Sequence, residues 1–250
     1  MKHKNIVIIG SDGKFGNFIS KHLSENLNHH VINIDITNNK KQTDYICDIT
    51  NEENVKDTIE KIREKYKSID CLINFSHYKG SGSRLVPNND FFKSIEDYPF
   101  EEWKKTLDVN LNGLFLTTKE FSKIFIKQKM GNFIFVSSTY GIVSPNKNIY
   151  GESGINSPIG YAVTKAGICN FTRYLATHLS EYGIIANCLV PGGIKDTSQN
   201  KEFINNYSNL TPLNRLSNLD DYVEPINFLI DPGKYYTGSI LTVDGGWTAW

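Results

Sequence analysis

The sequence has no long apolar run, no excess of either charge and no closely spaced pair of cysteines. Its first apolar stretch, residues 6–9, is too short for a signal peptide, and no later stretch approaches the length needed to cross a bilayer. Lysine plus arginine number 27, as do aspartate plus glutamate, so no long-range field would recruit nucleic acid or an anionic membrane. These absences predict a soluble, cytoplasmic protein that binds neither nucleic acid nor membrane.

The cysteines and histidines form no pattern that would bind a metal. Cys47, Cys71, Cys169 and Cys188 are far apart and lie in or beside apolar segments, which is typical of reduced thiols in a protein core. The 6 histidines also lack the spacing of metal ligands. We therefore expect neither a disulfide framework nor a metal site.

Strand-like runs alternate with amphipathic helical patterns along the chain. Such alternation predicts an α/β protein with a doubly wound parallel sheet, and the length fits a single domain over residues 1–250. The expected strands are residues 6–9, 31–34, 71–74, 133–136, 186–190 and 240–243, and the expected helices are residues 16–26, 52–66, 100–129, 161–181 and 219–229.

Two long connections, residues 76–99 and 192–218, interrupt this alternation. Loops of such length in a compact domain usually form lids or pocket walls. The second is rich in Asn, Ser, Thr and Lys, and we expect it to be a lid over a substrate.

Tyr161 and Lys165 lie four positions apart at the start of a helical apolar pattern. Residues i and i+4 of a helix lie one above the other, so both side chains should face one pocket. A free phenol loses its proton only near pH 10, and a neighbouring ammonium would stabilise its phenolate at lower pH. The spacing predicts a proton-transfer pair. Many surface helices carry such a pair by chance, so this prediction depends on the surrounding motifs.

A glycine-rich turn follows the first expected strand and opens the first helix. At such a turn, backbone N–H groups and the helix dipole bind the pyrophosphate of a dinucleotide. The residues of this turn that we expect to contact the cofactor are Gly10, Asp12, Gly13, Phe15 and Gly16.

Asp35 ends the second expected strand. A carboxylate there accepts hydrogen bonds from both adenosine ribose hydroxyls and repels a 2′-phosphate. The sequence therefore favours NAD over NADP as the cofactor. Lys14, Lys40 and Lys41 are the nearby cations that would offset this carboxylate and admit NADP.

Further motifs occur along nearly the whole chain, beside the glycine turn and the Tyr161 and Lys165 pair. They are Asp108-Val109-Asn110, Val136-Ser137-Ser138, Pro191-Gly192-Gly193 and Val243-Asp244-Gly245. Together these motifs resemble those of the short-chain dehydrogenase/reductase family. The resemblance implies a Rossmann-type fold and an NAD(P)-dependent enzyme that interconverts alcohols and ketones on a small-molecule substrate.

The sequence departs from the family pattern at two places. Ile9 replaces a threonine of the usual glycine motif, and Phe75, Ser76 and His77 replace smaller residues after the third strand. His77 is then either a substrate contact or a structural histidine.

The resemblance implies roles for four residues. Tyr161 passes a proton to or from the reacting oxygen, while Lys165 lowers the pKa of that tyrosine and binds the nicotinamide ribose. Ser138 holds the substrate oxygen, and Asn110 anchors a water that links the lysine to solvent. Taken singly, Ser138 could instead be a strand-end turn and Asn110 a helix kink; the presence of all four in family order disfavours both alternatives.

The resemblance also implies further contacts with the cofactor. Asp48, followed by Ile49, is expected at the adenine ring. The alternative for Asp48 is the N-cap of the next helix, a role for which Thr50 competes. The other implied contacts are Asn74 and, beside the nicotinamide carboxamide, Pro191, Gly193 and Ile194.

Residues 144–159 lengthen the chain between Ser138 and Tyr161. The segment is polar and contains glycine, so we expect a flap over the substrate and not a new core element. Its Tyr, Glu, Lys and Asn side chains suit the hydroxyl groups of a sugar or polyol. Together with the paired glycines after Pro191 and the Trp-rich terminus, the segment resembles a branch of the family associated with bacterial surface-sugar and flagellin modification.

Two other functions are compatible with these residues. A reductase of 3-oxoacyl thioesters would use the same four residues, but it would favour a basic docking patch and an apolar groove, unlike this neutral, Asn-rich lid. A dinucleotide-binding sensor or scaffold without turnover is the alternative of another class, and the intact set of four argues against it. The resemblance also implies a homo-oligomer, a tetramer or dimer, that packs through the helices at 100–129 and 161–181.

Overall fold

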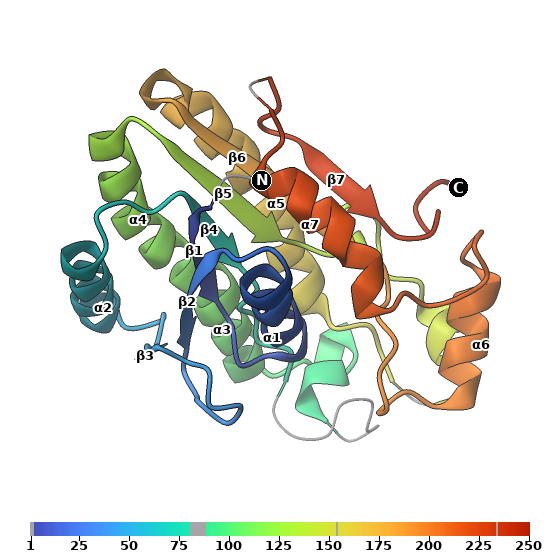
Figure 1. Ribbon diagram of the computed structural model, residues 1–250. Helices are drawn as coiled ribbons and strands as arrows, with labels where there is room; N and C mark the ends of the chain where they lie inside the picture. The colour runs from blue at the N-terminus through green and yellow to red at the C-terminus, as the bar shows by residue number, and fades with distance from the viewer. Residues whose placement is uncertain (1–2, 81–88, 154, 234) are drawn as a thin grey trace.

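The computed structural model describes residues 3–80, 89–153, 155–233 and 235–250. Residues 81–88 of the expected 76–99 loop and residue 154 of the expected flap lie outside these ranges. A 7-stranded parallel sheet runs through the molecule in the order β3-β2-β1-β4-β5-β6-β7 (Figure 1), which confirms the predicted doubly wound α/β class. The strands are β1 (Asn5–Ile9), β2 (His30–Asp35), β3 (Tyr45–Ile46), β4 (Cys71–Asn74), β5 (Gly131–Val136), β6 (Ile184–Pro191) and β7 (Ile240–Val243).

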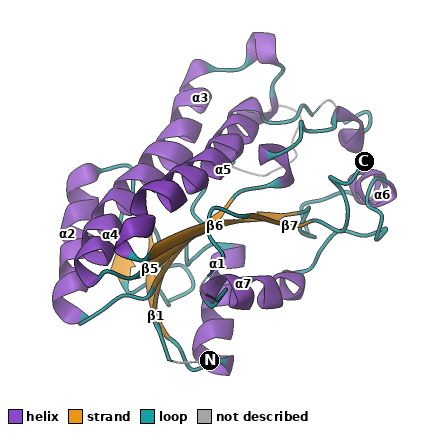
Figure 2. Ribbon diagram, turned by 90° about the horizontal axis from the view of Figure 1, so that it is seen from above, coloured by secondary structure: helices purple, strands orange, loops and turns teal. Residues whose placement is uncertain are grey.

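Helices cover both faces of the sheet, as the view along its edge shows (Figure 2). One face carries α2 (Glu52–Lys65), α3 (Phe100–Leu107), α4 (Leu114–Gln128) and α5 (Ile159–Leu179). The other face carries α1 (Lys14–Lys21) and α7 (Val223–Ile230), while α6 (Lys201–Asn209) lies beyond β7, near the C-terminus.

The strands read as continuous apolar runs because both of their faces are buried. In β1, Val7 and Ile9 join the cluster under α2, α4 and α5, whereas Ile6 and Ile8 join the cluster under α1 and α7. All four side chains are buried. This alternation gives the sheet two apolar layers and leaves its carboxyl-terminal edge for polar loops.

Three features of the fold differ from the sequence-based expectations. Strand β3 was not predicted, because its two residues, Tyr45 and Ile46, are too few to give a periodic signal. The helix expected over residues 100–129 contains a π-helical turn, Asp108–Gly113, between α3 and α4. Helix α6 lies within the stretch expected to be a lid, where its polar sequence hid the helical pattern.

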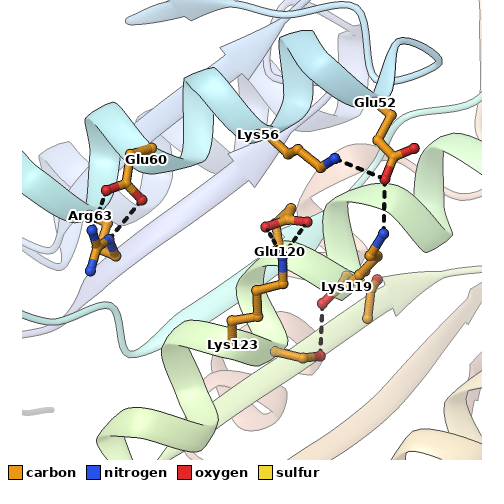
Figure 3. A network of polar contacts seen from close by, with 9 residues as sticks. Glu52, Lys56, Glu60, Arg63, Lys119, Glu120 and Lys123 are labelled. Atoms are coloured by element: carbon orange, nitrogen blue, oxygen red, sulfur yellow. Dashed lines mark hydrogen bonds and ion pairs between the residues drawn. The ribbon is translucent and has the colours of Figure 1, made fainter.

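One ion pair connects the exposed sides of α2 and α4, and further pairs lie beside it (Figure 3). The Glu52 carboxylate lies 2.8 Å from the Lys119 ammonium and 3.3 Å from that of Lys56. Two further pairs, Glu60 with Arg63 and Glu120 with Lys123, each lie within one helix. Exposed pairs of this kind contribute little to stability, so the two helices are held together mainly by the apolar layer beneath them.

No helix within the described ranges is long and apolar enough to cross a membrane. The four cysteines are buried free thiols, and no cluster of His, Cys, Asp and Glu suited to a metal ion occurs among the described residues.

Candidate active site

A cavity of about 800 Å³ lies at the carboxyl ends of the strands. It includes the point between β1 and β4 where the strand order reverses, which is where open α/β sheets bind their ligands. Of the predicted site residues, only Asn74 and Asn110 do not line it. Those that line the cavity are Gly10, Asp12, Gly13, Phe15, Gly16, Asp35, Asp48, Ile49, Ser138, Tyr161, Lys165, Pro191, Gly193 and Ile194.

The start of α5 places Tyr161 and Lys165 at one end of this cavity. Lys165 is buried, with 3% of the residue exposed. Its ammonium donates a hydrogen bond to the Val136 carbonyl at 2.7 Å and lies 5.4 Å from the centre of the Tyr161 ring. Burial lowers the pKa of Lys165 from 10.5 to about 8. The two side chains therefore lie close together, as the spacing predicts, and their role in proton transfer stays a prediction.

Ser138 follows β5 and begins a short 3-10 turn, Thr139–Gly141. Its hydroxyl accepts a hydrogen bond from the Tyr140 N–H at 3.3 Å. A Cβ at Gly141 would lie 2.6 Å from the Lys165 carbonyl oxygen, so only glycine lets this turn approach α5 so closely. The strand-end turn and the catalytic assignment are thus compatible, because the turn brings Ser138 to the same end of the cavity as Tyr161.

Asn110 lies in the π-helical turn and is 2% exposed. Its amide oxygen accepts a hydrogen bond from the Tyr78 N–H at 2.6 Å, and its amide nitrogen donates to the Tyr78 carbonyl at 3.2 Å and to the Thr164 hydroxyl at 3.1 Å. These bonds use the side chain to hold the loop after β4 against α5. The helix irregularity expected for Asn110 is present, and its role in a water relay stays a prediction.

The glycine turn has a backbone that other residues could not adopt. Gly10 has φ +81°, and a Cβ there would lie 2.7 Å from the Ser76 nitrogen. A Cβ at Gly16 would collide with the Gly10 carbonyl oxygen. Helix α1 begins after Gly13 without a side-chain cap, which leaves the first N–H groups of the helix for an anion. This cradle fits the pyrophosphate of a dinucleotide.

Asp35 and Asp12 form a connected pair beside this turn. The Asp35 carboxylate accepts hydrogen bonds from the Asp12 N–H at 2.8 Å and the Thr37 N–H at 3.2 Å. The Asp12 carboxylate in turn accepts from the Thr37 hydroxyl at 2.6 Å and from the N–H groups of Asn39 and Lys40 at 2.9 and 2.7 Å. Burial opposes the ionisation of Asp12, but these hydrogen bonds outweigh it and hold the pKa of its carboxyl below the ordinary value.

Three lysines were considered as cations that would offset Asp35, namely Lys14, Lys40 and Lys41. The Lys14 ammonium donates to the Lys195 carbonyl at 2.7 Å and pairs with Asp196 at 3.1 Å, on the opposite side of the cavity. Lys40 acts on Asp12 through its backbone N–H and its charge, although neither Lys40 nor Lys41 lines the cavity. The ribose end of the cavity is therefore lined by two carboxylates, Asp12 and Asp35, with Lys40 beside them.

Asp48 does not cap the helix that follows it. Its carboxylate accepts hydrogen bonds from the N–H and the hydroxyl of Thr50 at 2.9 and 2.7 Å, and Asn51 is the N-cap of α2. Neither Asp48 nor Thr50 thus fills the capping role that was considered for them. Asp48 and Ile49 both line the cavity, as the adenine assignment requires.

Asn74 and Gly193 make contacts within the protein that their expected roles did not include. The Asn74 amide oxygen accepts hydrogen bonds from the N–H and the hydroxyl of Ser76 at 2.9 and 2.6 Å, and so shapes the loop behind the cavity. The Gly193 N–H donates to the Tyr207 hydroxyl at 2.6 Å, and its carbonyl accepts from the Ser217 N–H at 2.9 Å. Both backbone groups of Gly193 are therefore occupied, although the residue lines the cavity.

Residues 144–159 and 192–218 pack together into one wall. The short helix Lys147–Tyr150 lies against α6, where the Asn206 amide donates to the Asn148 carbonyl at 3.4 Å. Ile149, Tyr150 and Ile155 are buried in an apolar cluster. The expectation that this segment adds nothing to the core is wrong, because these three side chains turn inward, while the polar residues around them give the sequence its flap-like composition.

Aromatic side chains that the sequence analysis missed line the substrate end of the cavity. Tyr207 of α6 stacks on Trp247, with ring centres 4.1 Å apart. The hydroxyls of Tyr140 and Tyr150 lie 3.5 Å apart, and burial raises the pKa of both. The rings come from distant segments, so no local period marks them. The aromatic residues that line this end are Tyr78, Phe91, Phe92, Tyr140, Tyr150, Tyr161, Phe203 and Tyr207.

His77 replaces a small residue at the edge of this pocket. One ring nitrogen, Nδ1, lies 2.9 Å from the Phe75 carbonyl and must carry a proton to bond with it. The ring centre lies 6.3 Å from that of Tyr161 in an edge-to-face arrangement. His77 is thus anchored to the backbone and also faces the catalytic end, so both of its expected roles fit the geometry.

The glycine cradle, the ribose-side carboxylates and the tyrosine–lysine pair along one cavity define a dinucleotide-dependent oxidoreductase. The chain belongs to the short-chain dehydrogenase/reductase family: a family model described as enoyl-(acyl carrier protein) reductase matches residues 19–248. It is accordingly an NAD(P)-dependent oxidoreductase that acts on CH–OH groups.

Three known proteins illustrate the relationship. The chain is 29% identical over 261 residues, 99% of each chain, to the post-translational flagellin modification protein A of Campylobacter coli. It is 29% identical over 206 residues, 81% of this chain and 75% of the other, to a 3-oxoacyl-(acyl-carrier-protein) reductase of Thermotoga maritima. A short-chain dehydrogenase of Leptospira borgpetersenii with bound NAD+ matches with a TM-score of 0.86 and 32% identity over 99% of this chain and 94% of that one.

Proposed function

We propose that this protein is an NAD-dependent oxidoreductase that interconverts an alcohol and a ketone on a sugar-like substrate. The observation that carries the proposal is a single cavity with the Tyr161 and Lys165 pair at one end and the Asp12 and Asp35 carboxylates at the other. The pair supplies acid/base chemistry, and the carboxylates select the cofactor.

The catalytic end assigns a task to each side chain. Tyr161 exchanges a proton with the substrate oxygen, and the Lys165 ammonium beneath its ring stabilises the phenolate. The Ser138 hydroxyl holds the same substrate oxygen as its charge changes. The bound dinucleotide supplies or accepts the hydride at the adjacent carbon.

The selection of NAD over NADP rests on the ribose end. A 2′-phosphate placed near Asp35 would meet one carboxylate directly and a second, Asp12, joined to it through the Asp12 N–H. Repulsion between charges at such distances disfavours the phosphate, because Lys14 points to the other side of the cavity. The Leptospira borgpetersenii relative was solved with NAD+ bound, in agreement with this choice.

The sugar-like substrate rests on the wall formed by residues 144–159 and 192–218. Aromatic faces can pack against the C–H face of a sugar ring, while phenols such as those of Tyr140 and Tyr150 bond to its hydroxyls. The full-length similarity to a flagellin modification protein supports a role in bacterial surface-glycan biosynthesis.

A 3-oxoacyl-thioester reductase is the second candidate. The similarity to the Thermotoga maritima reductase supports it, and the same catalytic residues would serve. Against it, the substrate end is lined by aromatic rings such as Tyr207, which stacks on Trp247, whereas an extended acyl chain would favour an open apolar groove.

We further propose that the protein works as a cytoplasmic homo-oligomer. Large apolar side chains are exposed on two neighbouring helices, with Phe115 of α4 at 52%, and Val163 and Tyr174 of α5 at 46% and 55%. A second copy packed on these helices would cover them. Light scattering of the purified protein tests this point, and a monomer at micromolar concentration would contradict it.

The function is tested by fluorescence titration with NADH and NADPH, followed by hydride-transfer assays with sugars, nucleotide sugars and an acetoacetyl thioester. We expect tighter binding of NADH and turnover of a sugar-type substrate. The Tyr161→Phe variant should bind NADH as the wild type does but lose about 10²- to 10⁴-fold in kcat. Turnover of the thioester alone would show that the protein is a 3-oxoacyl-thioester reductase. Binding of NADH without turnover of any substrate would favour a dinucleotide-binding sensor.

A further inference from the structure

The nucleotide half of the cavity is unusually acidic for a site that receives an anion. Four aspartates line it, Asp12, Asp35, Asp48 and Asp196, whereas Lys14 is the cation among the described residues that line this half. The other cavity-lining cations, Lys79 and Lys165, lie toward the catalytic end. A pyrophosphate carries two negative charges, so it would enter a field that repels it.

Lys14 lies next to the expected position of the pyrophosphate. It is the first residue of α1 and lies within the glycine turn that forms the pyrophosphate cradle, between Gly13 and Phe15. Its side chain extends across the cavity to the loop after β6, where the ammonium bonds to the Lys195 carbonyl at 2.7 Å and to Asp196 at 3.1 Å. The side chain is 51% exposed, so it is able to change partners.

Asp196 holds the opposite end of this contact firmly. One carboxylate oxygen accepts hydrogen bonds from the Ser198 N–H and hydroxyl at 3.0 and 2.9 Å, and the other pairs with Lys14. Hydrogen bonds from Ser198 first, and then the Lys14 ammonium, hold the pKa of Asp196 well below its usual range. Asp196 is therefore a fixed negative charge that faces the cradle.

We propose that Lys14 is a cofactor-binding residue whose ammonium changes partner. In the free protein it pairs with Asp196, and when the dinucleotide binds it contacts the pyrophosphate instead. Asp196 then competes with the pyrophosphate for the same ammonium. This inference rests on the proposed function, because it requires a nicotinamide dinucleotide in the glycine cradle. If the Lys14–Asp196 ion pair only stabilised the position of α1 against the 192–218 segment, no such competition would occur.

Opposite effects of two substitutions test the proposal. Lys14→Gln keeps a donor for the Lys195 carbonyl but removes the charge, and it should weaken NADH binding roughly tenfold. Asp196→Asn keeps an acceptor for Ser198 but releases Lys14, and it should tighten NADH binding at least twofold. Lys14→Arg should restore binding to within about threefold of the wild type. Lys21→Ala, an exposed lysine in the last turn of the same helix, is the matched control and should leave the Kd unchanged.

The measurement is the Kd for NADH from fluorescence titration at low and high salt, with thermal unfolding as a check on folding. Removal of the ammonium should also reduce the salt dependence of the Kd. Equal weakening by Lys14→Gln and Asp196→Asn would show that the ion pair only stabilises the position of α1, and an unchanged Kd in Lys14→Gln would likewise overturn the proposal. A wild-type protein that binds neither NADH nor NADPH would instead overturn the proposed function itself.

Discussion

The two halves of the cavity are built in different ways. The nucleotide half is built mainly from short turns that follow β1, β2 and β3, such as those of Gly10, Asp35 and Asp48, and Asp196 reaches it from the segment after β6. The substrate half is lined by side chains from distant segments, such as Tyr150 and Tyr207, that meet only in the folded protein. The geometry of the nucleotide half is therefore set mainly by the backbone, whereas that of the substrate half depends on how its side chains pack.

Lys165 lies at the catalytic end of the cavity, and the family resemblance also gives it a contact with the nicotinamide ribose, so its replacement should affect both catalysis and cofactor binding. We expect Lys165→Met to lose about 10²- to 10⁴-fold in kcat and also to bind NADH more weakly. Steady-state kinetics together with fluorescence titration measure the two effects. If kcat falls while the Kd for NADH stays at the wild-type value, the lysine serves the catalytic end alone.

Lys165→Met should also differ from the wild type in how its free energy of unfolding depends on pH. Because burial lowers the pKa of Lys165 from 10.5 to about 8, the folded protein loses this proton before the unfolded chain does. Below about pH 8, Lys165 is protonated in both the folded and the unfolded protein, and the cost of burying its ammonium is fully present. Between about pH 8 and 10.5 the unfolded chain binds more protons than the folded protein, so the free energy of unfolding rises with pH. Denaturant titrations should show the wild type gaining stability relative to Lys165→Met over this range. A constant difference between them would contradict the lowered pKa.

A change at Asp35 should affect the nucleotide half alone. Removal of this carboxylate in Asp35→Ser reduces the repulsion of a 2′-phosphate, while Asp12 still opposes it. We expect the preference for NADH over NADPH, measured as the ratio of the Kd values, to fall roughly tenfold without reversing. Substrate KM in the presence of saturating NADH should stay within twofold of the wild type, and a large change in KM would show that the halves are coupled.

A change at Trp247 should affect the substrate half alone. Trp247→Leu removes the ring on which Tyr207 stacks, and we expect the KM for substrate to rise several-fold with the Kd for NADH unchanged. Loss of buried aromatic surface should also lower the thermal midpoint. A conservative comparison is Trp250→Leu, whose ring is 77% exposed and whose replacement should alter neither quantity.

The smallest effect is expected outside the cavity, at the ion pair between α2 and α4 (Figure 3). Lys119→Ala breaks this exposed pair with Glu52 and should leave the free energy of unfolding nearly unchanged. Denaturant titration at low salt measures this change. A larger loss would mean that these surface charges fix the position of α2 and hence of Asp48 at the cavity.

The contrast between the halves also explains what the sequence could predict. Periodicity and motif position revealed six of the strands and the glycine turn, because the signals for these features are local. Helix α6 and the burial of Ile149 escaped prediction, since a polar, Asn-rich segment hides the few apolar residues that turn inward. The destination of Lys14 was also unpredictable, because Asp196 lies far along the chain and only the fold brings the two together.

The joint wall of residues 144–159 and 192–218 constrains how this enzyme could acquire a new substrate. The short helix Lys147–Tyr150 packs against α6, the Asn206 amide donates a hydrogen bond to the Asn148 carbonyl, and Gly151, with φ +56°, lies against the Glu202 carboxylate. The two segments are thus fitted to each other across a long stretch of sequence, and an exchange of either one alone would leave an unmatched surface. On the proposed function, a change of substrate preference would therefore require both segments to be exchanged together.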